Sequence, residues 1–234
     1  KLKKSLNKVN PDVGEIKQLL QQIINGSGFI EPLGEIYLRL AQNEKDGNAL
    51  IGYYSIVIKN CPKSAWAQRA VVELVPLLLM SGGQWNLTQE TESLLWKNTT
   101  NLLSPSPEAA SLGENPQDLC ADVFLQLLHL AHYRNDDAQI AALITQVPPR
   151  ALIYQDQIDL AAAYAKSRMG ERTKSRTAFQ AWLEKYKNSD YRPLGSLALY
   201  NASNNQSQME EALQMIDSYP DSLESLWLRA NLKQ

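Results

Sequence analysis

The feature of this sequence that most restricts its fold is a spacing of three or four residues between apolar side chains, which recurs along almost the whole chain. In the segment 117–133, apolar residues fall on one flank of a helix and polar residues on another. The apolar flank comprises Leu119, Phe124, Leu127, Leu128 and Ala131, and the polar flank comprises Asp118, Asp122, Gln126, His129 and Tyr133. Such helices are stable only when the apolar flank is buried against neighbours.

Short segments with turn chemistry interrupt this pattern, because Gly, Pro, Asn and Asp end helices and open turns. Between these segments we expect about twelve helices. Their approximate bounds are 12–24, 31–42, 47–59, 64–80, 87–103, 116–133, 136–146, 150–168, 171–186, 191–203, 207–218 and 222–233. Residues 53–58 have the composition of a strand, but the helical pattern around them favours a helix. The sequence therefore predicts an all-α fold.

Most of the turns are short, so consecutive helices are expected to be antiparallel neighbours. One break, residues 104–116, is longer and contains three prolines and a glycine, a composition typical of a linker. We predict an N-terminal helical-repeat half at 1–103, a Pro-rich linker at 104–116 and a C-terminal half at 117–234. The alternative is one continuous solenoid.

Composition and charge exclude several classes of function. The formal net charge is −2, with Lys and Arg scattered along the chain, so the basic face that nucleic-acid binding requires is not expected. The longest apolar stretch, Val71–Met80, contains Glu73 and Pro76. It is far shorter than the ~20 residues of a membrane span, and we predict no span.

The two cysteines, Cys61 and Cys120, are too few for a disulfide scaffold or a multi-cysteine zinc site. We expect two buried free thiols, with a single bridge in an oxidising compartment as the alternative. The chain begins with Lys-Leu-Lys-Lys and no Met, which is consistent with the removal of an export signal or a lipid-anchored leader.

A short polar link recurs before three of the expected helices. It reads Cys-Pro-Lys-Ser at 61–64, Tyr-Lys-Asn-Ser at 186–189 and Tyr-Pro-Asp-Ser at 219–222. The last two copies are 33 residues apart, close to the ~34 residues of a tetratricopeptide unit. In each copy Pro or a polar pair ends one helix and Ser caps the next.

On these residues the chain resembles the tetratricopeptide repeat family. In that repeat a Gly lies between the two helices and a small residue follows it, and these positions correspond to Gly170 and Ser175. Phe179 corresponds to the aromatic position. Trp182 corresponds to the second packing position, although Ala is usual there. Residues 49–70 are similar to the variant found in bacterial periplasmic members, some of them lipoproteins; the matching positions are Ala49, Tyr53, Ile56, residues 60–64, Trp66 and Ala70. The segment 81–116 matches only in helical pattern.

The resemblance implies a right-handed superhelix of antiparallel helix hairpins, in which each pair shares its apolar flank with the next. Members of the family usually hold a peptide or a helix of a partner protein on the concave surface. We therefore expect a non-catalytic scaffold or adaptor with a protein or peptide partner. The resemblance also favours an exported, periplasmic location over the cytoplasm.

No pattern in the sequence indicates catalysis, a cofactor or a metal. His129 and His132 lie three residues apart on one helix, without the spacing of HExxH or a cysteine partner, and are expected on a helix surface. Glu90, Glu92, Glu210 and Glu211 begin helices, where carboxylates favour the helix dipole. The alternative function is a helical-toroid carbohydrate-active enzyme or sugar-binding protein, which would need two carboxylates facing one cleft.

The most regular polar face defines the predicted partner-binding residues. Asp118, Asp122, Gln126 and His129 form this face on one helix, and Asp159 and Lys166 are the polar positions of the small-residue helix 157–168. The other reading of the face is a solvated outer surface. Trp66, Trp96, Trp182 and Trp227 are expected to pack between helices, and Trp85 is expected to be partly exposed.

Overall fold

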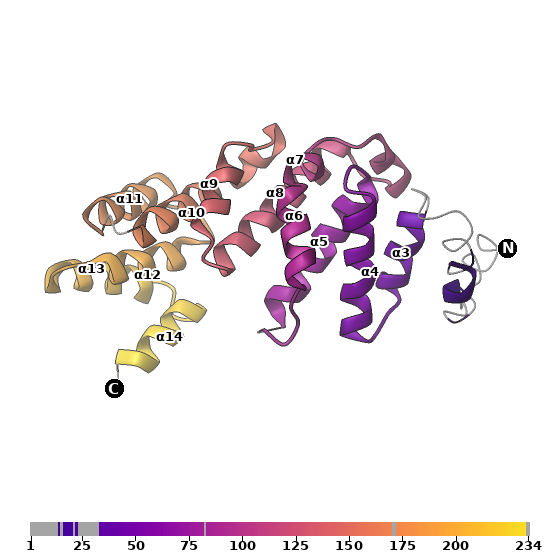
Figure 1. Ribbon diagram of the computed structural model, residues 1–234. Helices are drawn as coiled ribbons and strands as arrows, with labels where there is room; N and C mark the ends of the chain where they lie inside the picture. Colours follow the sequence, from indigo (N-terminus) through magenta and orange to yellow (C-terminus); the bar gives the residue numbers. More distant parts are fainter. Residues whose placement is uncertain are drawn as a thin grey trace. The chain divides into compact units, whose positions relative to one another are not determined.

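The structure is a computed structural model that describes residues 14, 16–20, 22, 33–81, 83–169 and 172–232. Within these ranges every regular element is a helix and no strand occurs (Figure 1). The all-α fold predicted from the sequence is confirmed. The chain forms two compact units, residues 1–127 with 148–150 and residues 128–147 with 151–234.

Three helices form the centre of the first unit: α3 (Leu33–Gln42), α4 (Gly47–Asn60) and α5 (Ala65–Met80). Each packs against the next, and α3 also contacts α5. The Asp46 carboxylate accepts a hydrogen bond from the Ala49 amide at 2.8 Å, and Ser64 Oγ accepts one from the Ala67 amide at 3.3 Å. These side chains cap the first turns of α4 and α5, as predicted for Ser64.

Two of the segments expected to be helical in this unit can be compared with the structure. Helix α4 includes residues 53–58, so the helical interpretation of that segment is confirmed. The helix expected at 12–24 lies largely outside the described residues, although positions 14, 16–20 and 22 are helical.

The single helix predicted at 87–103 was wrong, because two helices lie there: α6 (Gln89–Lys97) and α7 (Thr99–Leu102). At the break, Asn98 Nδ2 donates to the Leu94 carbonyl at 2.9 Å, and Thr99 Oγ1 donates to the Trp96 carbonyl at 2.9 Å. Hydrogen bonds from Asn and Thr side chains to nearby backbone groups compete with helix continuation. The apolar spacing did not reveal this competition.

Residues 104–116 pack against α5 within the first unit. They contain η1 (Pro107–Leu112), whose fully buried Ala109 belongs to one core cluster with Ala65 and Leu119. Arg69 Nη1 on α5 also forms an ion pair with Glu114 Oε1 at 2.7 Å. The two units divide further along the chain, between Leu127 and Leu128 of α8 (Pro116–Tyr133).

The second unit is also built from helices that pack against their neighbours in the chain. After the last turns of α8 it contains α9 (Asp137–Ile144), residues 151–154 of η2 (Pro149–Tyr154), α10 (Gln155–Arg168), α11 (Arg172–Lys185), α12 (Arg192–Ala202), α13 (Gln206–Asp217) and α14 (Leu223–Leu232). From α9 to α14 each helix packs against the next, and α12 also contacts α10 and α14. Leu160, Phe179, Trp182 and Leu199 are among its buried core residues.

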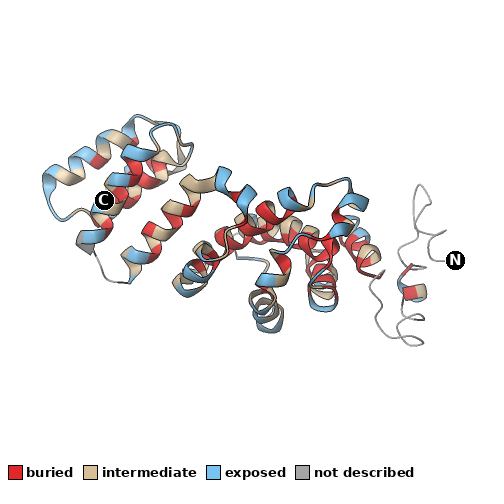
Figure 2. Cartoon of the chain, turned by 90° about the horizontal axis from the view of Figure 1, so that it is seen from above, coloured by how far each residue is buried: buried red, intermediate tan, exposed pale blue. Residues whose placement is uncertain are grey.

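Contacts between neighbouring and next-but-one helices are compatible with a helical repeat, in which local stacking buries the core. Figure 2 shows the pattern within each unit: buried residues follow the sides of helices that face their neighbours, and exposed residues follow the other sides. The predicted apolar flank of α8 is confirmed, since Leu119, Phe124 and Ala131 are buried, whereas on the polar flank Tyr133 is exposed and Asp122 is half-buried.

The predicted burial of the tryptophans is confirmed in part. Trp66 and Trp182 are buried, as predicted, whereas Trp96 is only half-buried. Trp85 is partly exposed, as predicted, and the Trp227 side chain and Gly170 lie outside the described residues.

Both cysteines are buried and no disulfide joins them, so the alternative of a bridge between Cys61 and Cys120 was wrong. In the described part of the chain, no helix combines the length and the apolarity needed to cross a bilayer.

Candidate functional site

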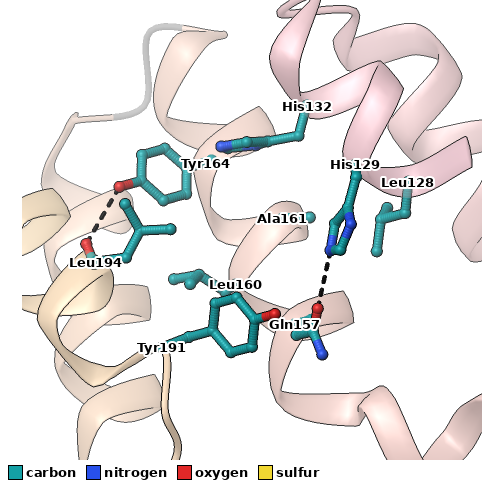
Figure 3. Close-up of a pocket in the computed structure, with 9 residues that line it drawn as sticks. All are labelled: Leu128, His129, His132, Gln157, Leu160, Ala161, Tyr164, Tyr191 and Leu194. Carbon is teal, nitrogen blue, oxygen red and sulfur yellow. Dashed lines mark hydrogen bonds between the residues drawn. The ribbon is translucent and has the colours of Figure 1, made fainter. Parts of the chain in front are cut away.

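A side-chain-sized hollow lies in the second unit, between the end of α8, α10 and α12 (Figure 3). Its volume is about 50 Å³. The apolar part of its wall comes from all three helices and comprises Leu128, Leu160, Ala161 and Leu194. Two histidines, Gln157 and two tyrosines complete the wall.

Helical spacing explains why these side chains converge. On α10, residues 157, 160, 161 and 164 follow the i, i+3, i+4, i+7 pattern of one helix face, and His129 and His132 lie about one turn apart on α8. The turn after α8 contains Asn135, which adopts a positive φ of 55°. The next residue, Asp136, caps α9 by accepting from the Gln139 amide at 3.0 Å.

Hydrogen bonds fix two sides of the hollow. A 2.9 Å hydrogen bond joins His129 Nε2 to Gln157 Oε1, and the Tyr164 hydroxyl donates to the Leu194 carbonyl at 3.2 Å (Figure 3). The Tyr191 hydroxyl points toward Gln157 in the same view and bonds to no protein group among the described residues. The rim therefore offers one uncommitted hydroxyl beside an apolar wall.

His132 is the most perturbed titratable group of the hollow. Burial and, to a smaller extent, the nearby Arg168 and His129 together lower the pKa of His132 to about 4, against the opposing effect of Asp137. Its ring packs edge-on against Tyr164, with 4.9 Å between ring centroids. Its Nδ1 atom is buried without a hydrogen-bond partner in the described structure. His132 is therefore neutral near pH 7 and contributes an uncharged surface.

A second, wider depression of about 540 Å³ lies at the first turn of α10 and the turn before α12. Leu152 and Ile153 line it and are 57% and 75% exposed. Lys185 and Tyr186 line its other side, and both bind Asp159 Oδ2, at 2.8 and 2.6 Å. Burial alone would raise the pKa of the Asp159 carboxyl, but the hydrogen bonds from these two groups and from Gln155 lower it. Asp159 is thus a fixed anion that orients two lining residues.

The structure places the predicted partner-binding residues in different surroundings. Asp118, exposed at the start of α8, lies 3.5 Å from Arg150, and Asp122 and Gln126 are half-buried on α8; all three belong to the first unit. Of the six, His129 lines the hollow and Asp159 supports the depression. Lys166 is exposed on α10 and lines neither.

The sequence analysis did not single out Gln157, Tyr164 or Tyr191, and treated His132 as a surface residue. The helical spacing of residues 157 and 164 could have indicated that both lie on the same face of one helix. Tyr191 precedes α12 and converges on the same hollow only through the packing of α12 on α10, which no local pattern indicates.

The hollow combines a mostly apolar wall with a few polar groups, a composition that is common in binding pockets. Among the described residues no group of three or more His, Cys, Asp or Glu side chains is arranged to hold a metal ion. Of the carboxylates considered for the enzymatic alternative, Glu90 pairs with Lys59 at 2.7 Å and Glu210 accepts from Gln206 at 3.1 Å.

Comparison with known proteins adds no assignment. No protein-family model, no curated protein and no solved structure matches the chain.

Proposed function

We propose that this chain is a non-catalytic protein-binding module of the tetratricopeptide-like helical-repeat type, and that a partner protein inserts one aliphatic side chain into the hollow between α8, α10 and α12. The single observation that carries the proposal is the hollow itself: a mostly apolar wall with a histidine–glutamine pair and a tyrosine hydroxyl at the rim. Partner segments are commonly anchored by a side chain that fills such a pocket.

The volume of the hollow favours a side chain over a free small molecule. At about 50 Å³ it is roughly a third of the ~150 Å³ apolar cavity that accommodates benzene. Most free ligands occupy pockets of roughly 300 Å³ or more. The branched end of Val, Leu or Ile fits the smaller space, and the partner backbone would then lie outside, near the rim.

A variant that fills the hollow tests this proposal. In Ala161→Leu the added carbons occupy the hollow, whereas the matched control Ala181→Leu adds the same atoms at an exposed position of α11. Peptides selected from a displayed random library against the wild-type chain are measured by fluorescence anisotropy on all three proteins. We expect Ala161→Leu to weaken binding by about tenfold or more and Ala181→Leu to leave it within about twofold.

Circular dichroism verifies that both variants remain folded. The proposal fails if the library yields no binding peptide, or if every selected peptide binds the filled variant as tightly as the wild type.

A further inference from the structure

We infer that Tyr191 is a polar recognition residue of the hollow. Its hydroxyl forms a hydrogen bond with the backbone of the partner segment beside the aliphatic anchor, and Ser189 holds the tyrosine in position. This inference rests on the proposed function and names the group of the chain that contacts the partner backbone.

The Tyr191 hydroxyl is free to bind a partner group. It points toward Gln157 and bonds to no protein group among the described residues (Figure 3). Other polar atoms of the wall are already engaged: His129 Nε2 bonds to Gln157 Oε1 at 2.9 Å, and the Tyr164 hydroxyl donates to a carbonyl of α12 at 3.2 Å. The Nδ1 atom of His132 is buried. Tyr191 therefore offers its hydroxyl at the rim.

An aliphatic anchor in the hollow brings the partner backbone to the same rim. The side chains of Val, Leu and Ile are short, so a chain whose side chain fills the hollow has its own peptide groups close to the rim. A peptide group that loses water on binding needs a new hydrogen-bond partner, because an unpaired buried backbone group costs free energy. The Tyr191 hydroxyl meets this need.

The chemistry of this hydroxyl suits either group of a peptide bond. A phenol hydroxyl both donates and accepts, so it can pair with a peptide carbonyl or with a peptide N–H. Burial raises the pKa of the Tyr191 hydroxyl, and the charges of Asp156 and Asp190 raise it too. The hydroxyl therefore keeps its proton at neutral pH.

Ser189 connects the backbone of Tyr191 to α10. The Ser189 hydroxyl donates to Asp156 Oδ2 at 2.5 Å and accepts from the Tyr191 amide at 3.1 Å. Asp156 is itself fixed, because its carbonyl accepts from the Trp182 indole at 2.7 Å and its Oδ1 accepts from the Gln157 amide at 2.9 Å. A group that is held in place before binding loses less freedom on binding. Ser189 is therefore a positioning residue for Tyr191.

Removal of the hydroxyl alone tests the inference. Tyr191→Phe keeps the ring and breaks no hydrogen bond of the described structure, whereas the matched control Tyr200→Phe alters a half-buried tyrosine of α12 that does not line the hollow. The peptides selected against the wild-type chain are measured by fluorescence anisotropy on both variants. We expect Tyr191→Phe to weaken binding by about two- to tenfold, to a similar extent for peptides of different sequence, and Tyr200→Phe to leave binding unchanged.

Variants of Ser189 test its positioning role. Ser189→Ala should weaken binding by about two- to fivefold, and Ser189→Thr, which keeps the hydroxyl, should bind as the wild type does. In the Tyr191→Phe background Ser189→Ala should have a smaller effect, because the hydroxyl that it positions is gone. Ser203→Ala removes a 2.7 Å hydrogen bond to the Leu199 carbonyl away from the hollow and is the matched control, with no effect on binding.

The outcomes separate the inference from the proposed function. If Tyr191→Phe binds every peptide as tightly as the wild type while Ala161→Leu loses binding, the inference is overturned and the proposed function stands. If the loss in Tyr191→Phe is confined to peptides with one particular polar side chain, the contact with the partner backbone is overturned. If Ser189→Ala has the same effect with and without the Tyr191 hydroxyl, its positioning role is overturned. If Ala161→Leu leaves the binding of every peptide unchanged, both the proposed function and the inference are overturned.

Discussion

At the scale of single residues, two glycines on helices have opposite consequences. A Cβ added at Gly195 on α12 would lie 2.6 and 2.8 Å from carbon atoms of the Trp182 ring, far inside van der Waals contact. Trp182 is 3% exposed and its indole Nε1 donates to the Asp156 carbonyl at 2.7 Å, so its ring has little freedom to move. A Cβ at Gly52 on α4 meets nothing within 4 Å. Gly195 therefore permits close approach of α12 to α11, whereas Gly52 has no packing role.

We predict that Gly195→Ala destabilises the second unit by about 1–3 kcal/mol, because the overpacked ring must shift. Gly52→Ala, in contrast, should stabilise the first unit by roughly 0.5–1 kcal/mol, because alanine loses less backbone entropy in a helix. Urea unfolding followed by circular dichroism measures both changes. A neutral or stabilising Gly195→Ala substitution would contradict the packing of Trp182 against this glycine.

His132 should make stability depend on acidity. Its pKa is about 4 in the folded chain and about 6.5 when unfolded, so the unfolded chain binds more protons between these values. Stability therefore falls as the pH is lowered from about 6.5 to 4. The loss from this one group is on the order of 3 kcal/mol.

The measurement is the free energy of unfolding of wild type and His132→Gln at a series of pH values between 7 and 4. Carboxylates contribute to the slope of both proteins, so the difference between the two curves isolates His132. We expect the variant to have the shallower slope. Parallel curves for wild type and His132→Gln would show that the imidazole is not desolvated.

At the scale of elements, the attachment of residues 104–116 to α5 depends on one buried side chain. Gln68 on α5 is fully buried, and its Nε2 donates to the carbonyls of Leu102 and Ser104, both at 2.8 Å. These carbonyls lie where α7 ends and the chain turns toward η1. Gln68 therefore satisfies backbone groups of an irregular segment that supplies few helical hydrogen bonds of its own.

We predict that Gln68→Met destabilises the first unit by about 2–4 kcal/mol, because a side chain of similar size leaves two carbonyls without a donor. The control Gln214→Met alters an exposed position of α13 and should change stability by less than about 0.5 kcal/mol. Equal midpoints of urea unfolding for the two variants would be inconsistent with this role of Gln68.

At the scale of the whole molecule, each of the two units contains its own buried core. In helical-repeat architectures stability is the sum of local terms and of contacts between neighbours, so a local perturbation acts mainly on its own region. Gly195→Ala should accordingly accelerate hydrogen exchange in α11 and α12 with little change in α4 and α5, and Gln68→Met should do the reverse. Native-state hydrogen exchange with peptide-level mass spectrometry measures this. A uniform loss of protection in either variant would indicate a single cooperative unit.

The sequence by itself determined the helices and most of their bounds, because apolar spacing, Gly and Pro positions and capping side chains act within a few residues. The Ser64 cap and the buried flank of α8 are examples. The sequence also singled out His129, through its place on a regular polar face.

Only the tertiary structure decided which side chains meet. The role of Gln68 and the burial of His132 depend on neighbours distant in the chain. The hollow arises because α8, α10 and α12 each contribute one face to it. A pattern with a period of three or four residues states which face of a helix is buried, but it does not state which other helix covers that face, because that choice is made by packing over the whole unit.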